Sequence, residues 1–415
     1  MKDFDINEFV QRFDHHDPQF GPNIDAVFKH MRGHCPVART EAYGGFWVLT
    51  RYKDVERVVR DDEGFSLRAG MSIPSNRAPG DPPWVLPGDL DPPESYTYRR
   101  LLEPVVDPRR LAEMEPWLRD VARELVDRII ERGEGDLVHD LAAPLTALAT
   151  LRLTGLPEAD WPHYVSERRS ANRMVQDPEE AMRKVMERFT WTKQAFLEAL
   201  EAQRAEPVEG GLIARLLEAR IDGRPLEEWE LLAILINFVT GGLETTQALL
   251  GSAWVHLARN PHDREDLLAN MDLMPRAIEE ILRYFSPQPG LARVATHDTE
   301  VGGQPLSEGE KVFMCWASAN RDEEIFENAD RFDIRRMPNR HLTFGAGAHH
   351  CLGANVTRLE ARICMEEVLR RMPDYRLVEE GLEPIPDIST VQGYLSVPVR
   401  FTPAATSGLP AVLPA

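Results

Sequence analysis

The chain has 415 residues, of which 68 are acidic and 48 are basic, so its formal charge is −20 with histidines neutral. This negative surplus excludes a generic nucleic-acid binder, which needs basic side chains to neutralise phosphates. The composition, 43% hydrophobic and 28% charged, is that of a soluble globular protein with a large core. No signal-peptide pattern and no membrane-length apolar run is present, so we expect a cytoplasmic protein that does not bind a membrane.

The periodicity of apolar residues and the placement of Gly and Pro define the predicted elements. In chain order they are a strand at 45–52, a long proline-rich loop at 74–93, helices at 111–132, 161–174, 179–202, 226–258 and 261–285, strands at 293–301 and 311–316 with a hairpin around Gly302, a helix at 354–372 and a strand at 394–401. The fold class is therefore mainly α with a minor β-sheet. We expect one domain over 1–415, with 1–20 and 403–415 as loosely ordered tails.

The long apolar helix at 226–258 carries a polar interruption at its centre. Gly241 and Gly242 each cost roughly 1 kcal/mol relative to alanine inside a helix, and Glu244 is costly to bury unpaired. A flat ligand over the glycines, beside a locally opened hydrogen-bond ladder, would explain both glycines and the neighbouring Thr245. The alternative is a surface helix with a polar face.

A glycine-rich loop, residues 344–353, places Cys351 directly before the helix at 354–372. Unpaired N–H groups and the macrodipole at a helix N-terminus favour a thiolate, the form of cysteine that binds metal. A buried cysteine in an ordinary turn remains an alternative at this point. A zinc site is disfavoured, because the consecutive His349, His350 and Cys351 cannot easily converge on one tetrahedral ion.

Further charged residues gain meaning only in combination. Glu280 and Arg283 stand three residues apart and can pair on one helix face. Arg99, Arg293 and His341 are cations that could meet a dianion. Taken singly, each of these features is typical of a surface or structural charge.

Taken together and in this order, these segments resemble the cytochrome P450 superfamily, specifically its soluble bacterial type. The haem-binding signature is matched by Phe344, Gly345, Gly347, Cys351 and Gly353. The Glu-x-x-Arg pair is matched by Glu280 and Arg283, and the distal-helix motif by residues 241–245. Residues 319–322 (Ala-Asn-Arg-Asp) and 91–94 (Asp-Pro-Pro-Glu) also match family landmarks. The resemblance implies a triangular, α-rich prism that encloses haem.

The resemblance also implies how haem b is held. Cys351 is then the ligand of the haem iron. A cysteine thiolate in this position donates electron density to the iron and favours O–O cleavage. The residues expected to contact haem are Cys351, Arg99, Arg293, His341, Phe344, Gly345, Gly241 and Gly242. Of these, Arg99, Arg293 and His341 match the positions that contact the haem propionates. One departure is that Ser95 stands where related sequences commonly have a histidine.

The activity implied by the resemblance is that of a haem-thiolate monooxygenase. Glu244 and Thr245 resemble the acid and alcohol that deliver protons to O2 during its activation, whereas Glu280 and Arg283 belong to the fold. Two alternatives are a related enzyme with peroxygenase, oxidative-coupling or isomerase chemistry, and a haem carrier or sensor without turnover. An acid and an alcohol inside an apolar helix favour the oxygen-activating enzyme.

The remaining expectations concern substrate and electrons. By resemblance, the pocket for a small, mostly apolar and possibly terpenoid substrate is lined by Met71, Ile73, Phe238, Leu291 and Val391. Electrons are expected from a separate ferredoxin and ferredoxin reductase. The arginines expected near the docking face for that acidic partner are Arg100, Arg109, Arg110, Arg335, Arg336, Arg340, Arg358 and Arg362.

Overall fold

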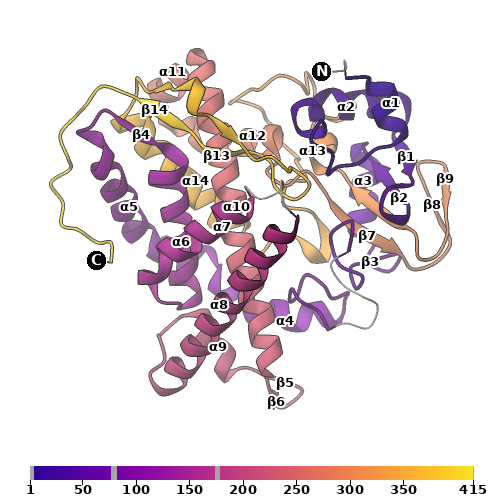
Figure 1. The fold of residues 1–415 in the computed structure, drawn as a ribbon, viewed down its shortest axis with the longest axis horizontal. Coiled ribbons are helices and arrows are strands. Elements are labelled where there is room, and N and C mark those ends of the chain that lie inside the picture. Colours follow the sequence, from indigo (N-terminus) through magenta and orange to yellow (C-terminus); the bar gives the residue numbers. More distant parts are fainter. Residues whose placement is uncertain (1–3, 76–81, 173–177, 415) are drawn as a thin grey trace. The chain divides into compact units, whose positions relative to one another are not determined.

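The computed structural model describes residues 4–75, 82–172 and 178–414, without the side chains of 167–189. The chain folds into two compact units (Figure 1). Unit 1 comprises Met1–Tyr98, Glu279–Cys351 and Pro386–Gln392, and unit 2 comprises Arg99–Ile278, Leu352–Ile385 and Gly393–Ala415. The expectation of one domain over 1–415 stays a prediction.

Unit 1 is built around a five-stranded sheet with the order β1-β2-β10-β7-β3, in which β2 and β10 run parallel and the other pairs antiparallel. Its strands are β1 (Val37–Thr40), β2 (Phe46–Leu49), β3 (Phe65–Ser66), β7 (Leu291–Ala295) and β10 (Lys311–Met314), with the hairpin of β8 (Thr299–Val301) and β9 (Gln304–Leu306). Its helices are α1 (Ile6–Gln11), α2 (Phe20–His34), α3 (Tyr52–Arg60) and α13 (Trp316–Ala319). Helices α4 (Glu94–Leu102) and α12 (Met274–Phe285) contribute residues to both units.

Alternation along the strands gives this sheet two buried faces. Phe46 and Val48 of β2 join a cluster that includes Phe9, Phe28 and Met31 of α1 and α2. Trp47 and Leu49, which alternate with these residues along β2, lie on the opposite face of the sheet. They contact a second cluster that includes the valines of α3. The N-terminal stretch that was expected to be loose is thus packed from Phe9 to Phe20, because its aromatic side chains build the first cluster.

Unit 2 is mainly helical. Its helices are α5 (Pro108–Ile130), the π-helical turn η3 (Leu137–Ala142), α6 (Ala143–Thr154), α7 (Trp161–Asn172), α8 (Pro178–Ala205), α9 (Leu212–Glu218), α10 (Glu228–Arg259), α11 (Pro261–Ala269) and α14 (Ala354–Arg371). Its strands are β4 (Glu134–Asp136), β5 (Arg220–Ile221), β6 (Arg224–Pro225), β11 (Arg376–Leu377), β12 (Glu383–Pro384), β13 (Tyr394–Ser396) and β14 (Pro398–Arg400). Residues 403–414 form neither helix nor strand, but Ser407 hydrogen-bonds Asp127 of α5.

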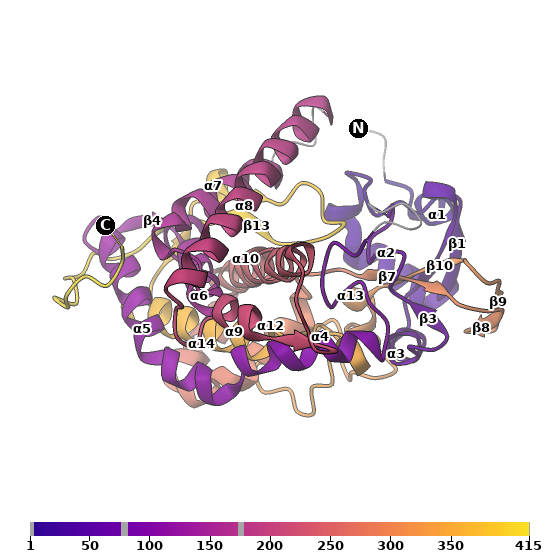
Figure 2. The same cartoon turned by 90° about the horizontal axis from the view of Figure 1, so that it is seen from below.

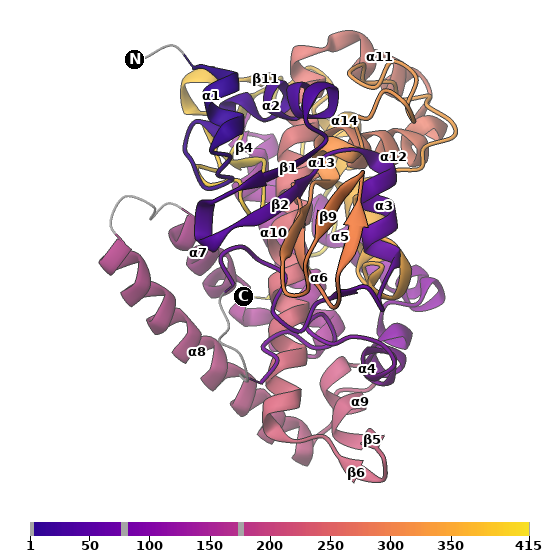
Figure 3. The same cartoon turned by 90° about the vertical axis from the view of Figure 1, so that its right-hand side faces the viewer.

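Helix α10 is the long apolar helix expected from the sequence, and it packs against α6 and α14. Figure 2 shows it almost end-on and Figure 3 along its length. Two expected elements are divided instead of continuous: 261–285 breaks into α11 and α12, and 293–301 into β7 and β8. The helix breaks where Asn270 accepts the Asp272 N–H and starts a new turn. Within the described residues, no helix has the length and apolar content to cross a bilayer.

Candidate functional site

The loop before α14 has a backbone that requires its glycines. Gly345 and Gly347 have φ values of 65° and 69°, in the left-handed region that favours glycine. A Cβ on Gly347 would lie 3.3 Å from the Val59 carbonyl oxygen of α3, so the two backbones approach closely. The Cys351 N–H donates to the Phe344 carbonyl oxygen over 2.9 Å and closes the loop.

Cys351 differs from the other three cysteines in its exposure. It is exposed, whereas Cys35 is half-buried and Cys315 and Cys364 are buried. Burial raises the pKa of the Cys315 and Cys364 thiols well above the ordinary value, which keeps them neutral. Cys351 is therefore the cysteine that can offer a thiolate to a ligand from outside the chain.

Hydrogen bonds fasten the start of the cysteine loop to the segment 319–322. The Leu342 N–H donates to Asn320 Oδ1 over 2.6 Å, and Asn320 Nδ2 donates to Thr343 Oγ1 over 2.9 Å. Thr343 in turn donates to the Leu282 carbonyl oxygen of α12 over 2.8 Å. The predicted landmark at 319–322 thus positions the loop that carries Cys351.

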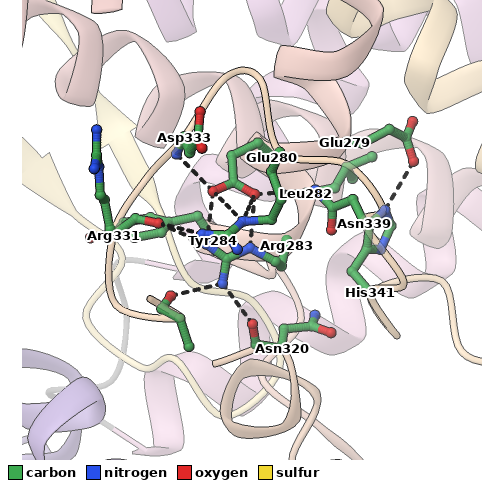
Figure 4. A network of polar contacts seen from close by, with 12 residues as sticks. Glu279, Glu280, Leu282, Arg283, Tyr284, Asn320, Arg331, Asp333, Asn339 and His341 are labelled. Carbon is green, nitrogen blue, oxygen red and sulfur yellow. Dashed lines mark hydrogen bonds and ion pairs between the residues drawn. The ribbon is translucent and has the colours of Figure 1, made fainter. Parts of the chain in front are cut away.

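The expected Glu280–Arg283 pair is confirmed and is completely buried. Both side chains are 0% exposed, and Nε and Nη2 of Arg283 lie 2.8 Å from the two carboxylate oxygens of Glu280. The guanidinium also donates to carbonyl oxygens, among them that of Asn320 (Figure 4). Glu280 accepts further hydrogen bonds from Arg336 and Asn339. Every charge is paired and hydrogen-bonded, as a buried ion pair requires.

Arg293 and His341, expected to contact propionates, each keep one buried polar atom without a partner in unit 1. Arg293 is 1% exposed; its Nη1 and Nη2 bind Asp62 and backbone carbonyls, but its Nε has no acceptor. His341 lies 3.0 Å from Glu279 through Nε2, and its buried Nδ1 is unpaired. Such orphaned atoms are rare in native proteins and mark a place for a further partner.

Ser95 and Arg99 come from the same helix, α4. The Ser95 hydroxyl is buried and has no hydrogen-bond partner, as is the case for Arg293 Nε and His341 Nδ1. Arg99 belongs to unit 2 and binds Glu103 over 3.2 Å, with its side chain 17% exposed. Arg99 is thus paired with a residue that directly follows its own helix.

The two glycines of α10 have different surroundings. A Cβ on Gly241 would meet nothing within 4 Å, so this position leaves open space on the helix. A Cβ on Gly242 would lie 2.5 Å from Thr150 Oγ1 of α6, so this glycine serves the packing of two helices. The expectation that Gly242 leaves room for a bound group is therefore not supported.

The polar pair of α10 lies in a continuous helix. We expected a local break in the backbone hydrogen bonds of this helix, but α10 is continuous from Glu228 to Arg259. Thr245 Oγ1 donates to the Gly241 carbonyl oxygen over 3.0 Å. Glu244 lines a small cavity with His139, Gln247 and Tyr394, among apolar walls. The cavity offers about 30 Å³ to water centres, which is room for roughly two molecules. Glu244 thus lies beside a space that water can enter.

A second acid beneath α10 was missed by the sequence analysis. Glu360 of α14 is 1% exposed; it hydrogen-bonds Thr246, which lies 3.2 Å from Thr357 Oγ1. Burial raises its pKa well above the ordinary value, and the Thr246 bond offsets only part of that shift. The available signal was a glutamate inside the apolar stripe of α14, beside Leu359.

The residues expected to line the substrate pocket fall into both units. Ile73 and Val391 are buried in unit 1, and Ile73 packs in the cluster with Phe313. Leu291 packs partly buried against the other cluster, and Phe238 is half-buried on α10 in unit 2. Met71 is half-buried, and its carbonyl oxygen accepts from Ala292 N–H over 2.7 Å.

Three comparisons identify similar proteins. Residues 262–388 match the family model described as Cytochrome P450. The chain is 34% identical over 381 residues to a steroid C26-monooxygenase of Mycolicibacterium smegmatis, covering 91% of this chain and 93% of that protein. Among solved structures it resembles cytochrome P450 CYP109Q5 from Chondromyces apiculatus, with a TM-score of 0.84, 30% identity and coverage of 95% and 100%. It also resembles CYP109E1 from Bacillus megaterium in complex with corticosterone, with a TM-score of 0.80, 28% identity and coverage of 91% and 98%.

The residues present fit a haem group. Cys351 supplies an exposed sulfur on a loop of unit 1 with a fixed backbone. The unpaired Arg293 Nε, His341 Nδ1 and Ser95 Oγ suit a ligand with several acidic oxygens, such as the two propionates. Within the described residues, no cluster of three His, Cys, Asp or Glu side chains could hold a bare metal ion.

Removal of the Glu280 carboxylate should destabilise the hydrogen-bond network that holds the cysteine loop. We expect Glu280→Ala to lower the free energy of unfolding by about 3 to 5 kcal/mol, because Arg283 is left as an uncompensated buried charge. The matched control is Glu56→Ala, which removes an exposed pair with Arg60 and should change the free energy by less than about 1 kcal/mol. Denaturant titration followed by circular dichroism measures both, and equal losses would contradict the assignment.

Glu360 should make stability fall as pH rises. Its pKa is raised in the fold, so the folded state holds a proton that the unfolded state releases above the ordinary value of 4.5. We expect the free energy of unfolding to decline above that pH, and to decline less steeply in Glu360→Gln. The control is Glu201→Gln, whose side chain is 73% exposed. Denaturant titrations between pH 5 and 8 would reject this expectation if both variants keep the original slope.

Proposed function

Because the chain belongs to the cytochrome P450 family, whose members are haem-iron oxidoreductases, we propose that it is a monooxygenase that holds haem b through Cys351 and oxidises a steroid-like substrate. The observation that carries the proposal is the exposed Cys351 on its anchored glycine loop. The alternatives without oxygen activation leave Glu244 and Thr245 of α10 without a role. The cytoplasmic location stays a prediction.

The protein's part in this chemistry begins with holding the cofactor. Haem bound to a cysteine thiolate supplies the binding and reductive activation of O2. Cys351 provides the sulfur, and Arg293, His341 and Ser95 have unpaired buried atoms for the propionates. Arg99 would have to exchange its bond to Glu103 for a propionate. Gly241 leaves room, and Phe344 fixes the loop through its carbonyl oxygen.

Glu244 and Thr245 are proposed to manage protons. Glu244 faces a cavity large enough for water, so it can take a proton from that side and pass it along α10. The Thr245 hydroxyl donates to Gly241 and keeps its oxygen lone pairs free to accept, so it can receive a proton from Glu244 or water. Both residues belong to unit 2 and are positioned by the same helix.

Two of the similar proteins support a steroid-like substrate. One is named a steroid C26-monooxygenase, and another is a structure in complex with corticosterone. The proposed lining residues, Met71, Ile73, Phe238, Leu291 and Val391, have apolar side chains, which suit a largely apolar ligand.

The proposal is tested first by spectroscopy of the haem-loaded protein. We expect a strongly red-shifted Soret band when the dithionite-reduced protein binds carbon monoxide, because a thiolate ligand donates electron density to the iron. Cys351→Ser should lose the band, and Cys35→Ser, at a half-buried thiol, should keep it. On the same sample, corticosterone should shift the spin state of the oxidised haem.

Haem content and circular dichroism show whether each variant is folded. A red-shifted band in folded Cys351→Ser would overturn the thiolate assignment. A spin-state shift with small terpenoids and none with steroids would overturn the substrate class and leave the monooxygenase proposal in place.

We further propose that electrons come from a ferredoxin, itself reduced by a ferredoxin reductase. A ferredoxin is generally acidic, so exposed arginines must offset a chain of charge −20. Among the arginines considered, Arg336 and Arg362 bind Glu280 and Glu115 and serve the fold. Arg100, Arg109 and Arg340 are exposed, and Arg109 stands at the start of α5.

Charge reversal at two positions of α5 should show whether Arg109 lies on the docking face for ferredoxin or acts only through the net charge of the protein. We expect Arg109→Glu to slow ferredoxin-driven reduction of the haem at low salt about tenfold, because the encounter is steered by charge. The control is Arg128→Glu, about 28 Å further along the same helix, which is exposed at 49%. Stopped-flow reduction measures both rates. Equal slowing in the two variants would reduce the effect to net charge and exclude Arg109 from the docking face.

A further inference from the structure

His16 joins two segments of unit 1 that are far apart in the sequence. Its Nε2 lies 2.9 Å from the Ile73 carbonyl oxygen, in the segment 71–75. Its Nδ1 lies 3.2 Å from Asp387 Oδ2, in the segment 386–392. Asp387 also accepts the Ser389 N–H over 2.9 Å, so its carboxylate is fixed by its own segment. We refer to this arrangement as the His16 clamp.

The partners of His16 define its protonation state. Both ring nitrogens face acceptors, a carbonyl oxygen and a carboxylate, but a neutral imidazole carries only one N–H. The doubly protonated imidazolium therefore completes both hydrogen bonds, and its charge is matched by Asp387. Loss of one proton breaks one of the two bonds and leaves the clamp attached to a single segment.

The charged and titratable groups around His16 support this assignment. Burial lowers its pKa, but the hydrogen bond to Asp387 and the Ile73 carbonyl outweigh burial and raise the pKa above 6.5. The neighbouring His15 ring, with its centroid 4.4 Å away, has its pKa lowered to about 4 by burial and by His16. Asp14 and the Tyr43 ring, 5.4 Å away, complete the surroundings. His15 is thus neutral while His16 carries the charge.

The two clamped segments carry three of the five residues proposed to line the substrate pocket. Met71 and Ile73 belong to the first segment, and Val391 to the second. Each segment is also tied to the rest of unit 1: Met71 through Ala292 N–H, and Gln392 through its N–H to the Pro287 carbonyl oxygen over 2.8 Å. The clamp is therefore a direct polar link between these two pieces of the proposed pocket wall.

We propose that protonated His16 is a positioning residue that fastens the segments 71–75 and 386–392 together, and that substrate affinity falls when His16 loses its proton. The inference rests on the proposed function, because that function makes the two segments part of the pocket. It adds a pH-dependent element to substrate binding.

The first test is the pH dependence of corticosterone binding between pH 6 and 9. The spin-state shift of the haem reports the binding. The dissociation constant of the original protein should rise about fivefold to tenfold with pH as the charged hydrogen bond is lost. His16→Gln should bind weakly at every pH, and His16→Arg, which keeps its charge and several donors, should bind tightly at every pH. His34→Gln, at an exposed histidine of α2, should behave like the original protein.

The second test needs neither substrate nor turnover. Hydrogen exchange measured by mass spectrometry should be faster by about fivefold in 71–75 and 386–392 of the haem-loaded His16→Gln protein at pH 6, because local opening becomes easier. Unchanged exchange in both segments, or an unchanged pH profile in His16→Gln, would overturn the clamp. A missing red-shifted carbon monoxide band in the original protein would instead overturn the proposed function.

Discussion

The buried carboxylate of Glu280 fixes the part of unit 1 that carries Cys351. It accepts hydrogen bonds from Arg283, Arg336 and Asn339, so the desolvation of its charge is offset on every side. The same Arg283 guanidinium reaches the Asn320 carbonyl oxygen, and the Asn320 side chain holds the residues before the cysteine loop. A local pair on one helix thereby determines the backbone of a loop some sixty residues later.

Polar groups in this protein are buried in two different ways. Around Glu280, each donor and acceptor of the pair is satisfied within the chain, and the result is rigidity. At Arg293, His341 and Ser95, one polar atom each is buried and unpaired. An unpaired buried donor is unfavourable unless a ligand completes it. An acidic partner that accepted hydrogen bonds from these atoms would remove an unfavourable term from the folded state.

The sequence predicted what depends on short spacing and missed what depends on long-range packing. The long apolar helix, the glycine loop before α14 and the Glu280–Arg283 pair all follow from residues a few positions apart. The role of Gly242 depends on Thr150 of another helix, and the burial of Glu360 depends on Thr246, so neither is visible in a local pattern. Strands such as β3 and β11 have two residues each, too few for an alternation to be recognised.

His16 in unit 1 and Glu360 in unit 2 both lower the stability of the fold in alkaline conditions. Each binds a proton more tightly in the folded state than in the unfolded state. His16 has a raised pKa, so its contribution is complete below 6.5 and is lost as the pH rises through the folded value. Glu360, also raised, is increasingly unfavourable as the pH rises above 4.5. Carboxylates with lowered pKa values act in the opposite direction: Asp387, held by His16, stabilises the fold above 3.8 and loses this effect in acid. Because His16 and Asp387 are partners, the clamp weakens at both extremes, and the two segments it joins are held best between these limits.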